Sequence, residues 1–132
     1  MSRPTKDQYY IGIAEAVAKR STCIRRQYGA VIVKNDRIVS TGYNGSPRNE
    51  TNCCDLGSCW REDHGIPHGE RYEKCMAVHA EMNAIINANP ADMIGATLYL
   101  AGVEDGKQIE KPEPCLLCEK MIRNAQIRMV VS

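Results

Sequence analysis

The stretches "VHAEMNAI" at residues 78–85 and "PEPCLLC" at residues 112–118 carry most of the information in this sequence. Residues 79–89 have the pattern of a helix that ends before Pro90. Residues 115–125 form a second predicted helix, and the proline directly before it suits a helix entry. Each stretch therefore places potential metal ligands at the start of a helix.

Strand signals surround these two helices. The other predicted elements are a helix at 6–20, a hairpin in "GAVIVKNDRIVSTG" with its turn at 34–36, a strand at 96–101 and a strand at 127–131. Strands that alternate with helices indicate right-handed crossovers and a layered α/β sheet, with the hairpin supplying antiparallel edge pairing. Residues 43–75 form a long loop rich in Gly, Pro, Asn, Cys and charge, and such loops normally carry function.

Composition limits the class of protein. With 132 residues and 43% hydrophobic content, the chain fits one domain, residues 1–132. The sequence stops directly after an apolar run, so a truncation at the C-terminus is an open alternative. The formal net charge of +1, with both signs interspersed, favours a small partner over a nucleic acid. No apolar run reaches the roughly 20 residues that span a bilayer, and no signal segment is visible, so we expect a soluble, cytoplasmic protein without membrane contact.

Three potential zinc ligands come from the two helix starts. Cys115 and Cys118 are three positions apart, so their sulfurs fall on one face of a helical turn and can bind one ion. The positive end of the helix dipole favours their thiolate forms. With His79 as the third ligand, the fourth tetrahedral position stays open, which is typical of a catalytic zinc that activates water. Glu81 is close enough in sequence to move protons without binding the metal.

Plainer interpretations of the same residues are a closed structural zinc site, or a capping Glu81 beside an ordinary His79. The alternative function from another class is a zinc-stabilised binding module without catalysis, which a closed site would support. Glu81 discriminates between an enzyme and a binding module, because a closed structural site has no need for an unliganded carboxylate beside the metal. The joint pattern of His-x-Glu and Pro-Cys-x-x-Cys is the signature of zinc deaminases.

With "HAEMNAI" and "PCLLC" in place, the chain resembles the cytidine deaminase-like superfamily, and "STGYNGSP" at 40–47 narrows the resemblance to the deoxycytidylate (dCMP) deaminase family. "STCIRRQYGAVIV", "GERYEKC" and "KMIRNAQI" are also similar to family segments, so nearly the whole chain is covered. The resemblance implies a three-layer α/β/α fold with a mixed central sheet and hydrolytic deamination of dCMP to dUMP, which supplies thymidylate synthesis. The segment "VEDGKQIEK" at 103–111 is longer than the corresponding link of many members, so the rim of the pocket is expected to differ from theirs.

The resemblance also assigns roles to individual residues. It implies a catalytic zinc bound by His79, Cys115 and Cys118. Glu81 then protonates N3 of the pyrimidine and helps ammonia leave. Asn44 matches a position that contacts the sugar, although Asn-Gly is also an ordinary turn sequence, and the backbone at Ala80 matches one that contacts the pyrimidine ring. Arg26, with Arg25 beside it, is a candidate for the 5′-phosphate, although surface arginines are common.

The remaining cysteines are Cys23 and four that lie in the long loop. Four thiolates complete a tetrahedral zinc site, and the resemblance supports a structural zinc on Cys23, Cys53, Cys59 and Cys75, with Cys54 unpaired. Buried free thiols, or His64 or His68 in place of one cysteine, are the alternatives.

Deaminases of another substrate, such as cytidine, dCTP, tRNA adenosine or a riboflavin-pathway pyrimidine, are the alternative enzymes. The "GYNG" motif and the cysteine-rich loop argue against them, and the near-neutral charge argues against tRNA. The resemblance further implies a homo-oligomer, often a hexamer, with dCTP and dTTP as candidate effectors.

Overall fold

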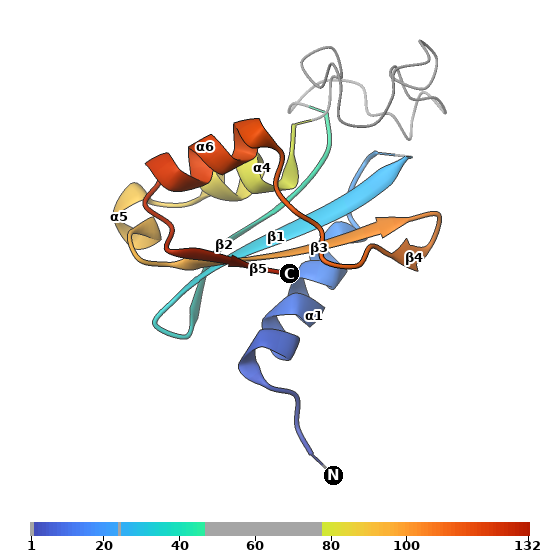
Figure 1. Ribbon diagram of the computed structural model, residues 1–132, viewed down its shortest axis with the longest axis horizontal. Helices are drawn as coiled ribbons and strands as arrows, with labels where there is room; N and C mark the ends of the chain where they lie inside the picture. Colours follow the sequence, from blue (N-terminus) through green and yellow to red (C-terminus); the bar gives the residue numbers. More distant parts are fainter. Residues whose placement is uncertain (1, 24, 47–77) are drawn as a thin grey trace.

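The structure is a computed structural model that describes residues 2–23, 25–46 and 78–132. Within these ranges the strands form one sheet with helices on both of its faces (Figure 1). The strands are β1 (Arg26–Lys34), β2 (Arg37–Tyr43), β3 (Thr97–Glu104), β4 (Lys107–Gln108) and β5 (Met129–Val131). The helices are α1 (Lys6–Ala18), α4 (Ala80–Asn87), α5 (Pro90–Met93) and α6 (Leu116–Asn124). None of the helices in the described ranges combines the length and the apolar character needed to cross a membrane.

The sheet is mixed. Its antiparallel path runs β2-β1-β3-β4, and β5 pairs with β3 in the parallel direction after the crossover through α6. Asn35 and Asp36 join β1 to β2 with φ angles of 52° and 60°, which match the type I′ turn that suits a hairpin. The predicted hairpin is confirmed, with β2 at the edge of the sheet and β1 inside it.

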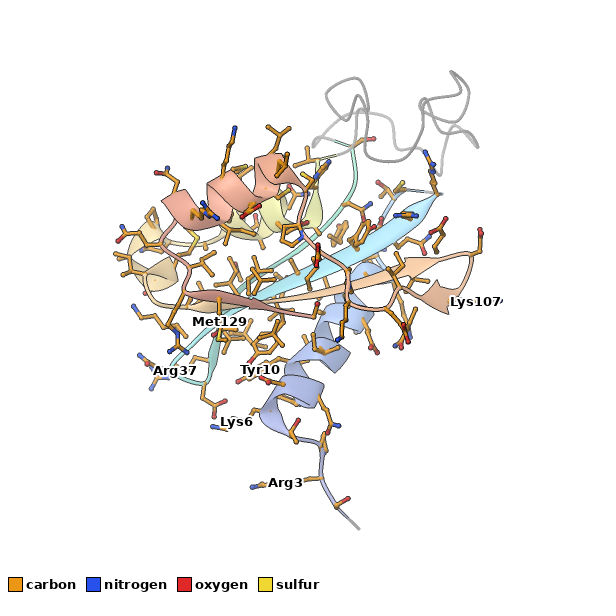
Figure 2. All side chains as sticks on the ribbon, viewed as in Figure 1. Arg3, Lys6, Tyr10, Arg37, Lys107 and Met129 are labelled. Atoms are coloured by element: carbon orange, nitrogen blue, oxygen red, sulfur yellow. The ribbon has the colours of Figure 1, made fainter. Side chains whose placement is uncertain are left out.

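Two hydrophobic layers flank β1 and β3, because alternate residues of a strand point to opposite faces. The layer toward α4 and α6 contains the buried residues Ala30, Ile32, Leu98 and Leu100. The layer toward α1 contains Val31, Val33, Tyr99 and Ala101. Tyr10 projects from α1 into this second layer (Figure 2). Burial on both faces explains the continuous apolar run of β1 and confirms the three-layer α/β/α prediction.

Gly42 sets the distance between β2 and α4. A Cβ atom at this position would overlap the backbone of Ala80 and Ala84, so only glycine allows this approach. The Ser40 hydroxyl donates to the carbonyl of Ala84 at 2.7 Å, and the Asn83 side chain donates to the backbone at the end of β2 at 2.8 Å. These contacts hold the start of α4 against the sheet.

Two local features differ from the predicted pattern. The helix predicted over 79–89 ends at Asn87, and Pro90 then opens the short helix α5. The cause is the Asn89 side chain, which caps α5 by accepting the N–H of Ala91 at 3.0 Å. The segment at 103–111 contains an additional strand, because β3 continues to Glu104 and turns back into β4.

Candidate active site

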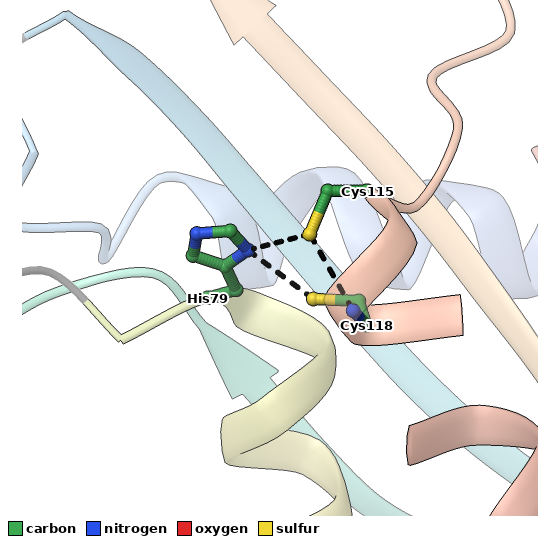
Figure 3. Close-up of side chains that lie close together, drawn as sticks. All are labelled: His79, Cys115 and Cys118. Carbon is green, nitrogen blue, oxygen red and sulfur yellow. Dashed lines mark hydrogen bonds between the residues drawn. The ribbon is translucent and has the colours of Figure 1, made fainter. Parts of the chain in front are cut away.

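Three potential metal ligands meet between the starts of α4 and α6 (Figure 3). His79 is the N-cap residue of α4 and Cys115 that of α6, while Cys118 lies in the first turn of α6. The Nδ1 atom of His79 lies 3.2 Å from the Sγ of Cys118 and 3.4 Å from the Sγ of Cys115, and all three ligand atoms lie within 4.8 Å of one another. The structure thus brings together the residues that the sequence predicts as a zinc site.

The spacing of these atoms fits a tetrahedral zinc ion. Zinc–sulfur bonds of about 2.3 Å and zinc–nitrogen bonds of about 2.0 Å place tetrahedral N and S ligands about 3.5 Å apart. The observed N–S distances agree with this value to within a few tenths of an ångström. Cys118 is fully buried, and burial raises the pKa of its thiol. A bound cation offsets that effect by favouring the thiolate, so the donor set suits zinc.

The helix ends explain why the ligand atoms are presented. His79 has an extended backbone, with φ −70° and ψ 152°, and its ring makes no capping bond to α4, so its Nδ1 atom faces the sulfurs. The Cys115 sulfur caps α6 by accepting the N–H of Cys118 at 3.4 Å. A sulfur at this position lies at the positive end of the helix dipole, which favours its thiolate form.

Glu81 is a buried carboxyl group beside the three ligands. It lies in the first turn of α4 and is 6% exposed. Burial raises the pKa of Glu81, whereas contacts with its own backbone N–H and with the Cys118 side chain oppose the rise. A carboxyl group whose pKa is raised toward neutral pH can both accept and donate a proton there, so Glu81 is suited to both steps.

Asn44 directly follows β2 and is 7% exposed. The next residue, Gly45, forms an antiparallel bridge with Val78, with N···O distances of 3.1 and 2.6 Å. Because Val78 precedes His79, the bridge brings Asn44 to the edge of the ligand cluster. The Asn44 side chain also accepts the backbone N–H of Tyr28 at 2.8 Å, so its contacts extend well beyond a local turn.

Arg26, at the start of β1, extends its side chain on the face of the sheet covered by α4 and α6. It shares that face with Tyr28 and Ala30, because alternate strand residues point the same way. Its Nε atom lies 2.8 Å from the Oε2 atom of Glu104, its partner across the strands, and its Nη1 atom donates to the Tyr28 hydroxyl at 3.4 Å. Arg25 precedes the strand.

Some of the remaining predicted residues lie within the described ranges, and the others lie outside them. Ala80, the predicted contact for a pyrimidine ring, is the first residue of α4 and is fully buried. Cys23 is a partly buried free thiol. The other residues named for the second metal site lie outside the described ranges: Cys53, Cys54, Cys59, His64, His68 and Cys75.

Sequence reasoning missed three residues that hold the predicted ones in place. Ser21 donates a hydrogen bond to the Asn44 side chain, Tyr28 contacts both Asn44 and Arg26, and Glu104 pairs with Arg26. Ser21 and Tyr28 lie in the family-like segment "STCIRRQYGAVIV" and Glu104 lies in the segment at 103–111, but neither stretch assigned these residues a role. Only the correct order and register of β1 and β3 would have placed Glu104 opposite Arg26.

Comparison with known proteins gives a family. The family described as "Cytidine and deoxycytidylate deaminase zinc-binding region" matches residues 4–132. The deoxycytidylate deaminase of Mycobacterium phage D29 is 41% identical over 136 residues, which cover 99% of this chain and 96% of that protein. The deoxycytidylate deaminase of Schizosaccharomyces pombe is 37% identical over 131 residues, which cover 98% of this chain and 37% of that protein.

A solved structure is similar over the same range. The crystal structure of dCMP deaminase from the cyanophage S-TIM5, in complex with dCMP and dUMP, has a TM-score of 0.68 and 30% sequence identity, and the match covers 98% of this chain and 82% of that chain. The family match includes the whole His79, Cys115 and Cys118 cluster. The chain therefore belongs to the cytidine and deoxycytidylate deaminase zinc-binding family.

Proposed function

We propose that this protein is a zinc-dependent dCMP deaminase, which converts dCMP and water to dUMP and ammonia. The observation that carries the proposal is the buried Glu81 carboxyl group beside the cluster of His79, Cys115 and Cys118. A closed structural zinc site has four protein ligands, whereas among the described residues this cluster offers three, with a carboxyl group next to them. The phage and yeast relatives are named deoxycytidylate deaminases, and the cyanophage enzyme was crystallised with dCMP and dUMP, which supports the choice of substrate.

The proposed chemistry divides between the metal and Glu81. His79, Cys115 and Cys118 would hold the zinc, which would act as a Lewis acid and lower the pKa of water. Glu81 accepts a proton from the attacking water and delivers it to N3 of the cytosine ring, while the water oxygen bonds to C4. Glu81 next transfers the remaining proton of that oxygen to the exocyclic amino group. The C4–N4 bond then breaks, and ammonia leaves.

Three further residues are assigned to substrate binding. The backbone at Ala80 is proposed to contact the pyrimidine ring, Asn44 the sugar and Arg26 the 5′-phosphate. The bridge between Gly45 and Val78 supports Asn44, because it brings that residue to the edge of the cluster. Arg26 lies on the face of the sheet that carries the cluster, which supports its role. Its guanidinium group is also suited to a phosphate, because it can donate two parallel hydrogen bonds.

The test is a substrate panel with the zinc-loaded protein. Formation of uracil products is followed for dCMP, CMP, deoxycytidine and dCTP, and the Glu81→Gln variant serves as the inactive control. Turnover of dCMP well above that of the other three, abolished in the variant, is the expected result. Turnover of none of them, with dCTP also supplied as activator, would overturn the proposal, while preference for another nucleobase substrate would reassign the enzyme within its family.

We also propose, from the resemblance, a second zinc on Cys23, Cys53, Cys59 and Cys75, and a homo-oligomer regulated by dCTP and dTTP. The partly buried free thiol of Cys23 is compatible with the metal site. Metal analysis is expected to give two zinc ions per chain, and light scattering is expected to give a hexamer. One zinc per chain in a fully active preparation would contradict the second site.

A further inference from the structure

The side chain of Asn44 has only one orientation compatible with its partners. Its Oδ1 atom lies 2.8 Å from the backbone N–H of Tyr28, which can only donate. Its Nδ2 atom lies 2.8 Å from the carbonyl of Arg26, which can only accept. Turning the amide by 180° would place its NH₂ group against the N–H of Tyr28 and its oxygen against the carbonyl of Arg26. The hydrogen-bond partners therefore fix which atom is Oδ1 and which is Nδ2.

Ser21 occupies the second acceptor position of the same oxygen. Its hydroxyl lies 2.6 Å from Asn44 Oδ1 and 2.8 Å from the Asn44 backbone carbonyl. That carbonyl already accepts the N–H of Thr22 at 3.3 Å, and the contact with Oδ1 is shorter, so we assign the single hydroxyl hydrogen to Oδ1. The hydroxyl oxygen in turn accepts the N–H of Cys23 at 3.2 Å, which orients the serine.

These contacts leave one function for the Asn44 amide. An amide oxygen has two lone pairs, and Tyr28 and Ser21 use both of them. One Nδ2 hydrogen bonds to Arg26, and within the described residues the second Nδ2 hydrogen bonds to no other group. We propose that Ser21 is a positioning residue that restricts Asn44 to donating one hydrogen bond to an oxygen acceptor of the nucleotide. The substrate part of this inference rests on the proposed dCMP deaminase activity.

The first test follows the Asn44 side chain without using activity. The Tyr28 N–H donates to Asn44 Oδ1, so its hydrogen exchange reports how firmly that side chain is held. Ser21→Ala is expected to raise the Tyr28 exchange rate about five- to tenfold, as the loss of one hydrogen bond implies. Ser21→Thr keeps a hydroxyl and is expected to restore the wild-type rate to within about twofold. Unchanged Tyr28 exchange in Ser21→Ala would overturn the proposal, whether or not dCMP is turned over.

The second test is a double-mutant cycle in kcat/KM for dCMP. Ser21→Ala alone is expected to lower kcat/KM about five- to tenfold, mainly through a higher KM. Added to Asn44→Ala, the same change is expected to cost less than about twofold, because Ser21 acts through Asn44. Losses that simply multiply would overturn the proposal. A wild-type protein that does not deaminate dCMP would instead overturn the proposed function, and the exchange result would still decide the role of Ser21.

Ser40→Ala is the matched control. Ser40 is buried, whereas Ser21 is half-buried. Like Ser21, Ser40 donates its hydroxyl hydrogen to a carbonyl oxygen, that of Ala84 at 2.7 Å, and it makes no bond to Asn44. Its loss is expected to leave Tyr28 exchange unchanged relative to the other amides of β1. In the kinetic cycle its effect is expected to multiply with that of Asn44→Ala. A Ser40 variant that behaves like Ser21→Ala in both tests would show a general loss of stability and overturn the proposal.

Discussion

The Nδ1 atom of His79 lies 3.2 Å from the sulfur of Cys118, although the two residues belong to the starts of different helices. α4 and α6 pack together on one face of the sheet (Figure 1). A metal ion bound at this point would join the N-terminal ends of both helices. A metal bound here is therefore expected to stabilise the packing of α4 against α6, in addition to its role in the chemistry.

Removal of zinc with a chelator is expected to lower Tm by about 8 °C or more, because an ion present at 100 times its Kd contributes about 2.7 kcal/mol to stability. Scanning calorimetry with and without chelator measures the shift. Cys115→Ser is the control, since it lacks one ligand of this cluster and reports the response of any second site alone. Equal chelator shifts in the two proteins would contradict a stabilising metal at this cluster.

Replacement of Glu81 by Gln is expected to lower kcat at least about 100-fold, because the side chain can no longer exchange protons with the substrate. Zinc content and Tm are expected to stay at or above the wild-type values, since the change removes a buried ionisable group whose pKa is raised by burial. Glu119→Gln, whose partly exposed carboxylate pairs with Arg123 at 2.9 Å, is expected to keep activity within about twofold. Loss of zinc from the Glu81 variant would instead mark Glu81 as a metal ligand.

Replacement of Arg26 by Gln is expected to lower kcat/KM for dCMP at least about tenfold and to leave that for deoxycytidine unchanged. The reason is that only dCMP carries the phosphate that Arg26 is proposed to bind. Arg37→Gln, an exposed position on β2, is the control for general loss of positive charge. Equal losses with both substrates would show that Arg26 only supports the fold, through its ion pair with Glu104.

The α1 layer is expected to lose stability at alkaline pH. The hydroxyl of Tyr10 donates to Asp36 at 2.6 Å, and this hydrogen bond is the largest cause that raises the pKa of Tyr10 from 10.0 to about 12. Burial, with a hydrogen bond to Asp7, raises the pKa of Tyr99 from 10.0 to about 12 as well. Because the folded pKa values are the higher ones, this stabilisation is complete below pH 10 and is lost as the pH rises from 10 to about 12.

Urea unfolding of Tyr10→Phe between pH 8 and pH 11 tests this expectation. The variant is expected to be about 1 kcal/mol less stable at pH 8 and to lose less stability than the wild type as the pH rises. Tyr9→Phe is the control, because Tyr9 is 52% exposed. Parallel pH profiles for the wild type and Tyr10→Phe would rule out the hydrogen bond as the cause.

Gly42→Ala is expected to destabilise the protein by about 2 kcal/mol or more and to weaken zinc binding, because the new Cβ atom would push α4, and His79 with it, away from β2. Chemical denaturation and zinc titration measure the two effects. Gly12→Ala is the matched control, since a Cβ atom there meets nothing within 4 Å in the helix α1, and a gain of about 0.5–1 kcal/mol is expected. Gly42→Ala with wild-type zinc affinity would contradict this coupling.

Much of the fold could be predicted from local patterns in the sequence. The apolar spacing of α1, the β-branched runs of β1 and β2 and the proline before Cys115 each depend on residues within one or two turns or one strand, so their elements could be predicted. β4 and α5 were not predicted. β4 is a two-residue strand whose pairing to β3 no short pattern encodes, and α5 depends on a cap at Asn89 that also reads as a loop residue.

By itself, the sequence determined which residue types could form the site, because His-x-Glu and Cys-x-x-Cys at helix starts limit the chemistry to a small set. Only the tertiary structure decided that His79 and Cys118 meet, that Glu81 is buried beside them, and that Ser21 and Tyr28 use both lone pairs of the Asn44 oxygen. The physical reason is that burial and hydrogen bonding depend on distances between segments far apart in the chain. Strand order and the close approach of α4 to Gly42 set those distances.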